Sequence, residues 1–203
     1  MMYTILSIKR KKSQDINEIS TDLLQHVVFP ISAPLTHIFN ISIQKGIFPD
    51  IFKMAKVIPI FKSNDKKDMS FYRGVTLTDS FSKVFEKIAS DKLTEFLVST
   101  NFFFDHQFGF LKNRSTNHAI IDFINQISDN LNKGNILLGL FMDVKKCFDC
   151  ISHDILFKKL ENAGVRGISL NWFKSFFHKR QQKVKIGSNY SDNICDIDIS
   201  TFQ

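Results

Sequence analysis

The chain has 203 residues, of which 43% are hydrophobic, and it carries a formal net charge of +7. This length supports one domain with a core of its own, and the hydrophobic fraction is that of a globular fold rather than of a disordered chain. The charge favours nucleic acid or another polyanion as a partner, although a basic protein without such a partner fits it equally well. The 22 phenylalanines predict a strongly aromatic core, or else reflect a skewed nucleotide composition.

Targeting and cysteine signals are weak. Cys147, Cys150 and Cys195 show no disulfide-framework spacing, and the single CxxC pair has no second pair with which to complete a zinc site. We therefore expect reduced thiols in an intracellular protein of the cytoplasm or nucleus. The sequence has no secretory signal of the usual form and no apolar stretch long enough to span a membrane.

The first half of the chain alternates helix and strand signals after a basic lead-in at residues 1–15, which we expect to be poorly ordered. Helices are predicted over 20–29, 33–45 and 80–98, and strands over 55–61 and 73–77. Pro59 marks the first strand as an edge strand or an irregular one. The charged stretch 62–70 is either a solvated connector or a loop that faces nucleic acid.

In the second half of the chain, the pattern of apolar residues predicts helices over 115–131, 153–162 and 168–178, and strands over 136–143 and 181–186. The apolar run 136–142 is too short for a confident helix and is typical of a buried strand. Asp143 follows it directly. Because an isolated buried charge is very costly, this carboxylate must be solvated, paired or bound to a metal. The element order indicates an α+β fold with α/β-like character.

Short motifs recur along the chain in a fixed order. They are Gly46-Ile-Phe-Pro-Asp50, Ala55-Lys-Val-Ile-Pro-Ile-Phe-Lys62, Phe71-Tyr-Arg-Gly-Val-Thr-Leu77, Ser82-Lys-Val-Phe-Glu-Lys87, Gln107-Phe-Gly-Phe-Leu-Lys-Asn-Arg-Ser-Thr116, Phe141-Met-Asp-Val-Lys-Lys-Cys-Phe-Asp149, His153-Asp-Ile-Leu156 and Leu170-Asn-Trp-Phe-Lys-Ser-Phe176. This series resembles the reverse transcriptases of non-LTR retrotransposons, most of all the jockey-type mobile elements. One such motif would be weak, but the whole ordered set argues against chance.

The resemblance implies the fingers and the first part of the palm of a right-hand polymerase. Residues 16–190 would form a partial reverse transcriptase domain, with fingers at about 46–135 and palm at about 136–190, followed by a divergent tail at 191–203. The expected activity is extension of a DNA primer with deoxynucleoside triphosphates on an RNA template, through Mg2+-dependent phosphoryl transfer.

The resemblance also assigns roles to single residues. Asp143 would be the catalytic residue that coordinates Mg2+, an ion that prefers hard oxygen ligands. Arg73 would lie near the triphosphate, the backbone at Val144 would face it, and the ring of Phe148 would exclude a 2′-hydroxyl. Without the resemblance, Phe148 is better explained as a core residue. Asp149 would be structural.

Five basic residues are candidate contacts to nucleic acid: Lys62, Lys112, Arg114, Lys145 and Lys146. Phosphate contacts dominate the affinity of proteins for nucleic acids, which is the physical reason for this choice. Each of them taken alone is better explained as an exposed surface charge.

The sequence departs from the family pattern mildly at Val75, Thr76 and Cys147, which stand in place of Ile, Ser and Ala, and more clearly elsewhere. Gly74 stands where the family has Pro, and Leu111 where it usually has Arg. The family's Pro-Gln-Gly and Ala-Asp-Asp motifs do not follow residue 187, and Asp196 and Asp198 alternate with Ile instead of standing together. We therefore expect a domain that ends before the Ala-Asp-Asp hairpin and an isolated chain without activity, because two-metal catalysis needs more than one carboxylate. The alternatives are a non-catalytic nucleic-acid-binding module and a metal-site protein built on Cys147 and Cys150.

Overall fold

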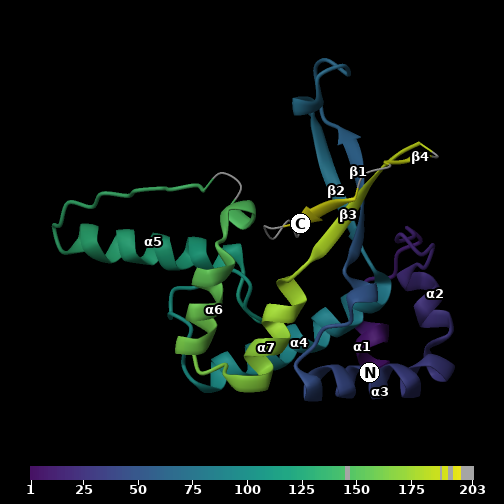
Figure 1. Cartoon of the computed structure of the whole chain (residues 1–203). Helices are drawn as coiled ribbons and strands as arrows, with labels where there is room; N and C mark the ends of the chain where they lie inside the picture. Colours follow the sequence, from purple (N-terminus) through teal and green to yellow (C-terminus); the bar gives the residue numbers. More distant parts are fainter. Residues whose placement is uncertain (145–146, 188, 192–193, 198–203) are drawn as a thin grey trace. The chain divides into compact units, whose positions relative to one another are not determined.

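The computed structural model describes residues 1–144, 147–187, 189–191 and 194–197, and for 148, 149 and 195–197 it describes the backbone alone (Figure 1). The chain divides into two compact units, which are treated separately below. The first consists of Met1–Leu93 and Lys146–Gln203, and the second of Thr94–Lys145. Helices and strands are mixed, as the sequence predicts for an α+β fold.

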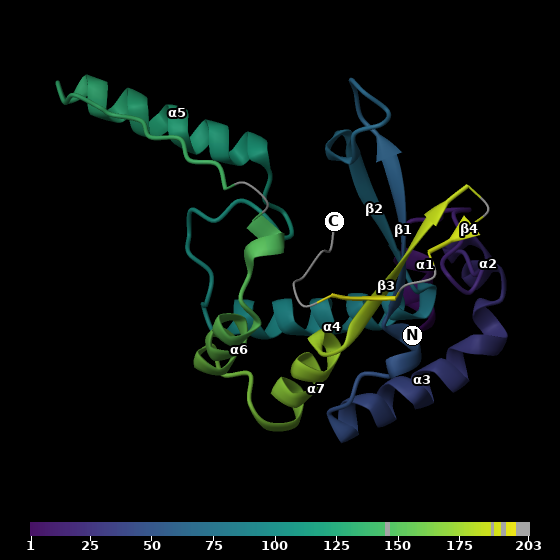
Figure 2. The same ribbon diagram turned by 45° about the horizontal axis from the view of Figure 1, so that its top comes forward.

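Strand β1 (Met54–Phe61) is the centre of the sheet in the first unit. It pairs antiparallel with β2 (Tyr72–Thr78) and parallel with β3 (Arg180–Ile186). Strands β4 (Asn189–Tyr190) and β5 (Cys195–Ile197) each pair antiparallel with β3. Figure 2 shows the β1–β2 hairpin running on beyond its contact with β3.

Pro59 lies in the part of β1 that only β2 accompanies. Its ladder partner on β2 is Gly74, whereas the pairing of β1 with β3 ends at Val57. The missing N–H of proline therefore falls where one side of the strand has no neighbour, which is where a sheet tolerates it. The sequence predicted an edge strand or an irregular one, and the structure shows an edge only beyond Val57, because β1 is paired with β3 from Met54 to Val57.

Helices α2 (Thr21–His26) and α3 (Val28–Lys45) follow the lead-in. Ser20 caps α2 by accepting a hydrogen bond from the backbone N–H of Leu23, and α3 ends at Gly46 in the left-handed conformation, with φ 64°. The sequence predicts a helix at each of these places, over 20–29 and 33–45. The predicted helix boundary near Pro30 is wrong, because Pro30 lies in the first turn of α3, where proline is tolerated.

The lead-in is ordered, which corrects the expectation for residues 1–15. Residues Met2–Ser7 form helix α1, and the side chain of Ile5 is only 1% exposed within the main core. The side-chain amide of Gln25 on α2 donates to the carbonyls of Ile5 and Ile8, at 3.0 and 2.8 Å. These bonds satisfy carbonyls at the end of α1 that would otherwise lack partners.

The main core of the first unit is aromatic. Phe48, Phe85 on α4 (Ser80–Ser99) and Trp172 on α7 (Gly167–Phe177) are 0–2% exposed, and their rings meet edge to face at centroid distances of 5.4 and 6.3 Å. The indole N–H of Trp172 donates to the hydroxyl of Ser42 at 2.8 Å. Part of the phenylalanine content is thus used in packing, as predicted, whereas other rings such as Phe29 and Phe110 are 79% and 91% exposed.

Smaller elements complete the first unit. Helix α6 (His153–Asn162) packs on α7 through a second cluster formed by Leu160, Val165 and Leu170. Three short 3-10 helices are η1 (Asp50–Phe52), η2 (Met69–Phe71) and η3 (Cys147–Cys150). The charged stretch 62–70 connects β1 to β2, as predicted. Among the described residues, no helix has the length and apolarity needed to cross a bilayer.

The second unit contains the end of α4, helix α5 (Thr116–Asn132) and the stretch that leads to Asp143. Ser115 caps α5 by accepting from the backbone N–H of His118. Residues 135–144 are irregular, which corrects the predicted strand over 136–143. A strand needs a neighbour to satisfy its backbone polar groups, and no described strand pairs with this stretch.

Candidate active site

Asp143 lies in the second unit at the end of an exposed apolar segment. Leu138 is 93% exposed and Met142 83%, and the carboxylate of Asp143 is itself exposed. The segment runs beside α5, where the rings of Phe141 and Phe123 meet edge to face at 5.6 Å. The structure thus shows an exposed carboxylate, and it corrects the expectation that Asp143 ends a buried strand.

The residues that follow Asp143 are only partly described. Val144 is 64% exposed, whereas Lys145 and Lys146 lie outside the described residues. Phe148 lies within η3, in the first unit, and its side chain is outside the description. The assigned roles of Val144, Lys145, Lys146 and Phe148 therefore stay predictions.

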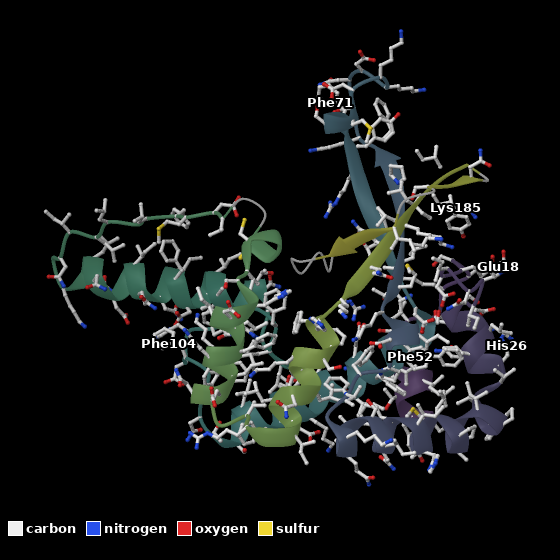
Figure 3. All side chains as sticks on the ribbon, viewed as in Figure 1. Glu18, His26, Phe52, Phe71, Phe104 and Lys185 are labelled. Carbon is white, nitrogen blue, oxygen red and sulfur yellow. The ribbon has the colours of Figure 1, made fainter. Side chains whose placement is uncertain are left out.

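Lys62 and Arg73 come together on the β1–β2 hairpin. Arg73 is paired in register with Ile60, and the backbone N–H of Lys62 donates to the carbonyl of Phe71 at 2.8 Å. Figure 3 labels Phe71 near the far end of this hairpin. Both basic side chains are exposed. The hairpin thus presents two of the predicted cations, Arg73 on β2 and Lys62 directly after the end of β1.

Lys112 and Arg114 lie in the loop before α5, in the second unit. Lys112 is exposed, whereas Arg114 holds the loop together. Its guanidinium donates to the carbonyls of Asp105 and Gln107, and it lies 5.6 Å from the ring centroid of Phe108. These contacts give Arg114 a role in shaping the loop, besides the phosphate contact predicted for it.

A buried carboxylate in the lead-in went unnoticed in the sequence. Asp15 is 1% exposed, and its carboxylate accepts hydrogen bonds from the backbone N–H groups of Asn17, Ile19 and Ser80 at 2.7–3.0 Å. Its carbonyl accepts a bond from the ammonium of Lys56 on β1 at 2.6 Å. Asp15 therefore joins the lead-in to both α4 and the sheet.

Asp79 is the second buried carboxylate and caps α4. It accepts from the backbone N–H groups of Phe81 and Ser82 at 2.8 and 3.0 Å, and from the amide of Asn17 at 2.9 Å. Burial, together with the nearby charge of Asp15, raises the pKa of Asp79 despite these bonds. An acidic residue directly before an amphipathic helix is an N-cap signal that could have found it.

The cations around this cluster are buried to different extents, since Lys83 is half-buried and Arg180 is 2% exposed. Burial lowers the pKa of Lys83, although the charges of Asp15 and Glu86 oppose that shift. Burial likewise lowers the pKa of Arg180, which lies 3.7 Å from Glu86 and 4.5 Å from the ring centroid of Phe176. Asp15 and Asp79 thus join the lead-in to α4, and Arg180 joins β3 to α4 through Glu86.

Comparison with known proteins decides the family. The family described as "Reverse transcriptase (RNA-dependent DNA polymerase)" matches residues 64–197, which is more than half of the chain and includes Asp143. The chain belongs to the reverse transcriptase family. The resemblance seen in the ordered motifs is thereby confirmed.

The relatives of this reverse transcriptase chain come from non-LTR elements of flies. It is 27% identical over 191 residues to the "Probable RNA-directed DNA polymerase from transposon BS" of Drosophila melanogaster, which covers 92% of this chain and 21% of that protein. It is also 27% identical over 153 residues to the "RNA-directed DNA polymerase from mobile element jockey" of the same fly. That match covers 75% of this chain and 17% of the jockey protein. The jockey polymerase of Drosophila funebris is 26% identical over 151 residues, a match that covers 74% of this chain and 16% of that protein. The chain thus spans about a fifth of the length of these relatives.

Proposed function

We propose that this chain is the fingers and first palm segment of an RNA-directed DNA polymerase, which extends a DNA primer on an RNA template with deoxynucleoside triphosphates. The observation that carries the proposal is the family match over residues 64–197, which contains the stretch Phe141–Asp149 and its carboxylate Asp143. The similarity to RNA-directed DNA polymerases of transposons BS and jockey supports it.

Asp143 is proposed to be a ligand of catalytic Mg2+. Its carboxylate is exposed, so it can approach an ion that keeps several waters and phosphate oxygens in its shell. When bound, Mg2+ would neutralise charge on the triphosphate and help activate the primer hydroxyl. The contribution of the chain is then to supply one hard oxygen ligand at the end of the 135–144 segment.

The hairpin cations are proposed to contact the incoming nucleotide and the nucleic acid. Arg73 offers a planar fork of donors suited to phosphate, and Lys62, directly after the neighbouring strand β1, offers a point charge. Lys112, Arg114, Lys145 and Lys146 are proposed to add backbone contacts. The backbone at Val144 and the ring of Phe148 are proposed to complete the nucleotide site, with the ring selecting against a 2′-hydroxyl.

The isolated chain is proposed not to synthesise DNA. Two-metal transfer requires ions held by several ligands, and no group of three His, Cys, Asp or Glu side chains forms within the part of the chain that is described. The test is a primer-extension assay with a DNA primer on an RNA template, in the presence of Mg2+ or Mn2+. We expect no incorporation. Synthesis that is abolished by Asp143→Asn would overturn the proposed inactivity.

A non-catalytic nucleic-acid-binding module is the second candidate function. The net charge of +7 favours it. It predicts that the chain binds an RNA–DNA hybrid and that the affinity falls steeply with salt, because phosphate contacts release counterions. A salt-independent affinity would exclude phosphate binding. The third reading, a metal protein built on Cys147 and Cys150, finds no supporting ligand group among the described residues.

A further inference from the structure

Cys147 and Cys150 are the first and last residues of the 3-10 helix η3, and both carry free, exposed thiols. A structural zinc site would need about four ligands. No group of even three potential ligands forms in the described ranges of the chain. The two thiols are therefore accessible to reagents and are not explained by a metal site.

The geometry of a 3-10 helix brings the two thiols into line. Three residues complete one turn with a rise of about 2.0 Å each, so residues i and i+3 are eclipsed and their Cα atoms lie about 6 Å apart. Disulfides join Cα atoms about 4.4–6.8 Å apart. Cys147 and Cys150 thus start within the span of a disulfide, and closing the bond would mainly require their Cβ atoms to approach.

We propose that Cys147 and Cys150 are a reversible oxidation site that closes an intramolecular disulfide across η3. The co-reactant is a small disulfide such as oxidised glutathione. The thiolate of one cysteine attacks it and releases one glutathione thiol, and the second cysteine then displaces the other glutathione as the S–S bond closes. The protein loses two protons and two electrons, and one oxidised glutathione becomes two reduced ones.

The consequence of this bond rests on the proposed polymerase function. Phe148 lies between the two cysteines, and η3 begins four residues after Asp143. Oxidation would therefore fix the backbone of the turn that carries the proposed sugar-contacting ring. Reduction would release it, which makes the turn sensitive to the thiol redox state.

The test is oxidation of the full chain carrying Cys195→Ser, in buffers of graded oxidised-to-reduced glutathione ratio, with alkylation and mass spectrometry. We expect both thiols to disappear with a mass loss of two hydrogen atoms, at a ratio that does not depend on protein concentration. Dithiothreitol should restore both thiols. Cys150→Ser should instead retain one mixed glutathione disulfide.

A matched variant separates the geometry of η3 from mere proximity in sequence. Cys150→Ser combined with Ile151→Cys keeps two thiols but moves one of them beyond the end of η3, out of the eclipsed i, i+3 position. We expect the disulfide of this variant to close only at an oxidised-to-reduced glutathione ratio at least about tenfold higher than that needed by the Cys147–Cys150 pair. Equal closure of the two pairs, lasting adducts on both cysteines, or disulfide-linked dimers would overturn the proposal. This readout does not involve nucleic acid, so a failure of hybrid binding would count against the proposed function alone.

Discussion

The buried carboxylate of Asp15 gives the strongest prediction about stability. Asp15→Ala removes the acceptor of three backbone N–H groups, those of Asn17, Ile19 and Ser80. Hydrogen bonds to a charged group contribute about 1.5–3 kcal/mol each, and a buried donor left without a partner costs about 1–3 kcal/mol. Because two of the three donors are only partly buried and such effects are not additive, we expect a loss of about 3–5 kcal/mol.

That loss is measurable by urea unfolding followed through the fluorescence of Trp172, the single tryptophan, which lies in the core of the first unit. Asp15→Asn keeps one acceptor oxygen and should fall between wild type and Asp15→Ala. Lys12→Ala, at an exposed position of the same lead-in, should stay within about 0.5 kcal/mol of wild type. If Asp15→Ala were as stable as Lys12→Ala, the lead-in would not be docked as described, and the reasoning would be refuted.

Two further predictions concern the same unit. Phe48→Ala empties a fully buried position among four aromatic neighbours, so it should lower the free energy of unfolding by about 3–5 kcal/mol in the same assay. Phe110→Ala, at a position 91% exposed in the second unit, should lower it little. Similar losses for both variants would contradict the assigned core. Burial raises the pKa of Asp79 in the folded state above its value of about 3.9 in the unfolded chain. The stability that this raised pKa contributes is therefore full below the unfolded pKa and is lost as pH rises through the folded pKa. Asp79→Asn keeps an N-cap oxygen and removes this titration, so its stability relative to wild type should rise with pH over that range; a difference that does not change with pH would show that Asp79 titrates normally.

The sequence predicts elements whose signals are local. Helices α4 and α5 were expected from their apolar stripes, and Ser115 marks the start of α5 by capping a donor within its own first turn. Gly46 ends α3 because the left-handed conformation there disfavours other residues. In each case the deciding interactions lie within a few residues of the signal.

The sequence fails where the deciding interactions are distant. The lead-in is ordered through Asp15 and Ser80, which lie 65 residues apart in sequence, and nothing in its basic composition indicates that contact. The run 136–142 has the composition of a strand, but a strand exists only when another strand pairs with it. For the candidate site, the motif identifies Asp143, whereas the pairing of β1 with β2 is what brings Lys62 and Arg73 onto one hairpin.

The most direct test of the polymerase assignment is a graft into a relative. The aligned segment of the Drosophila melanogaster jockey polymerase would be replaced by this chain, and a parallel graft from the Drosophila funebris jockey polymerase would show that the exchange itself is tolerated. We predict Mg2+-dependent primer extension by the graft of this chain, and at least about a hundredfold loss with Asp143→Asn. An inactive graft beside an active control, or activity that does not depend on Asp143, would contradict the assignment.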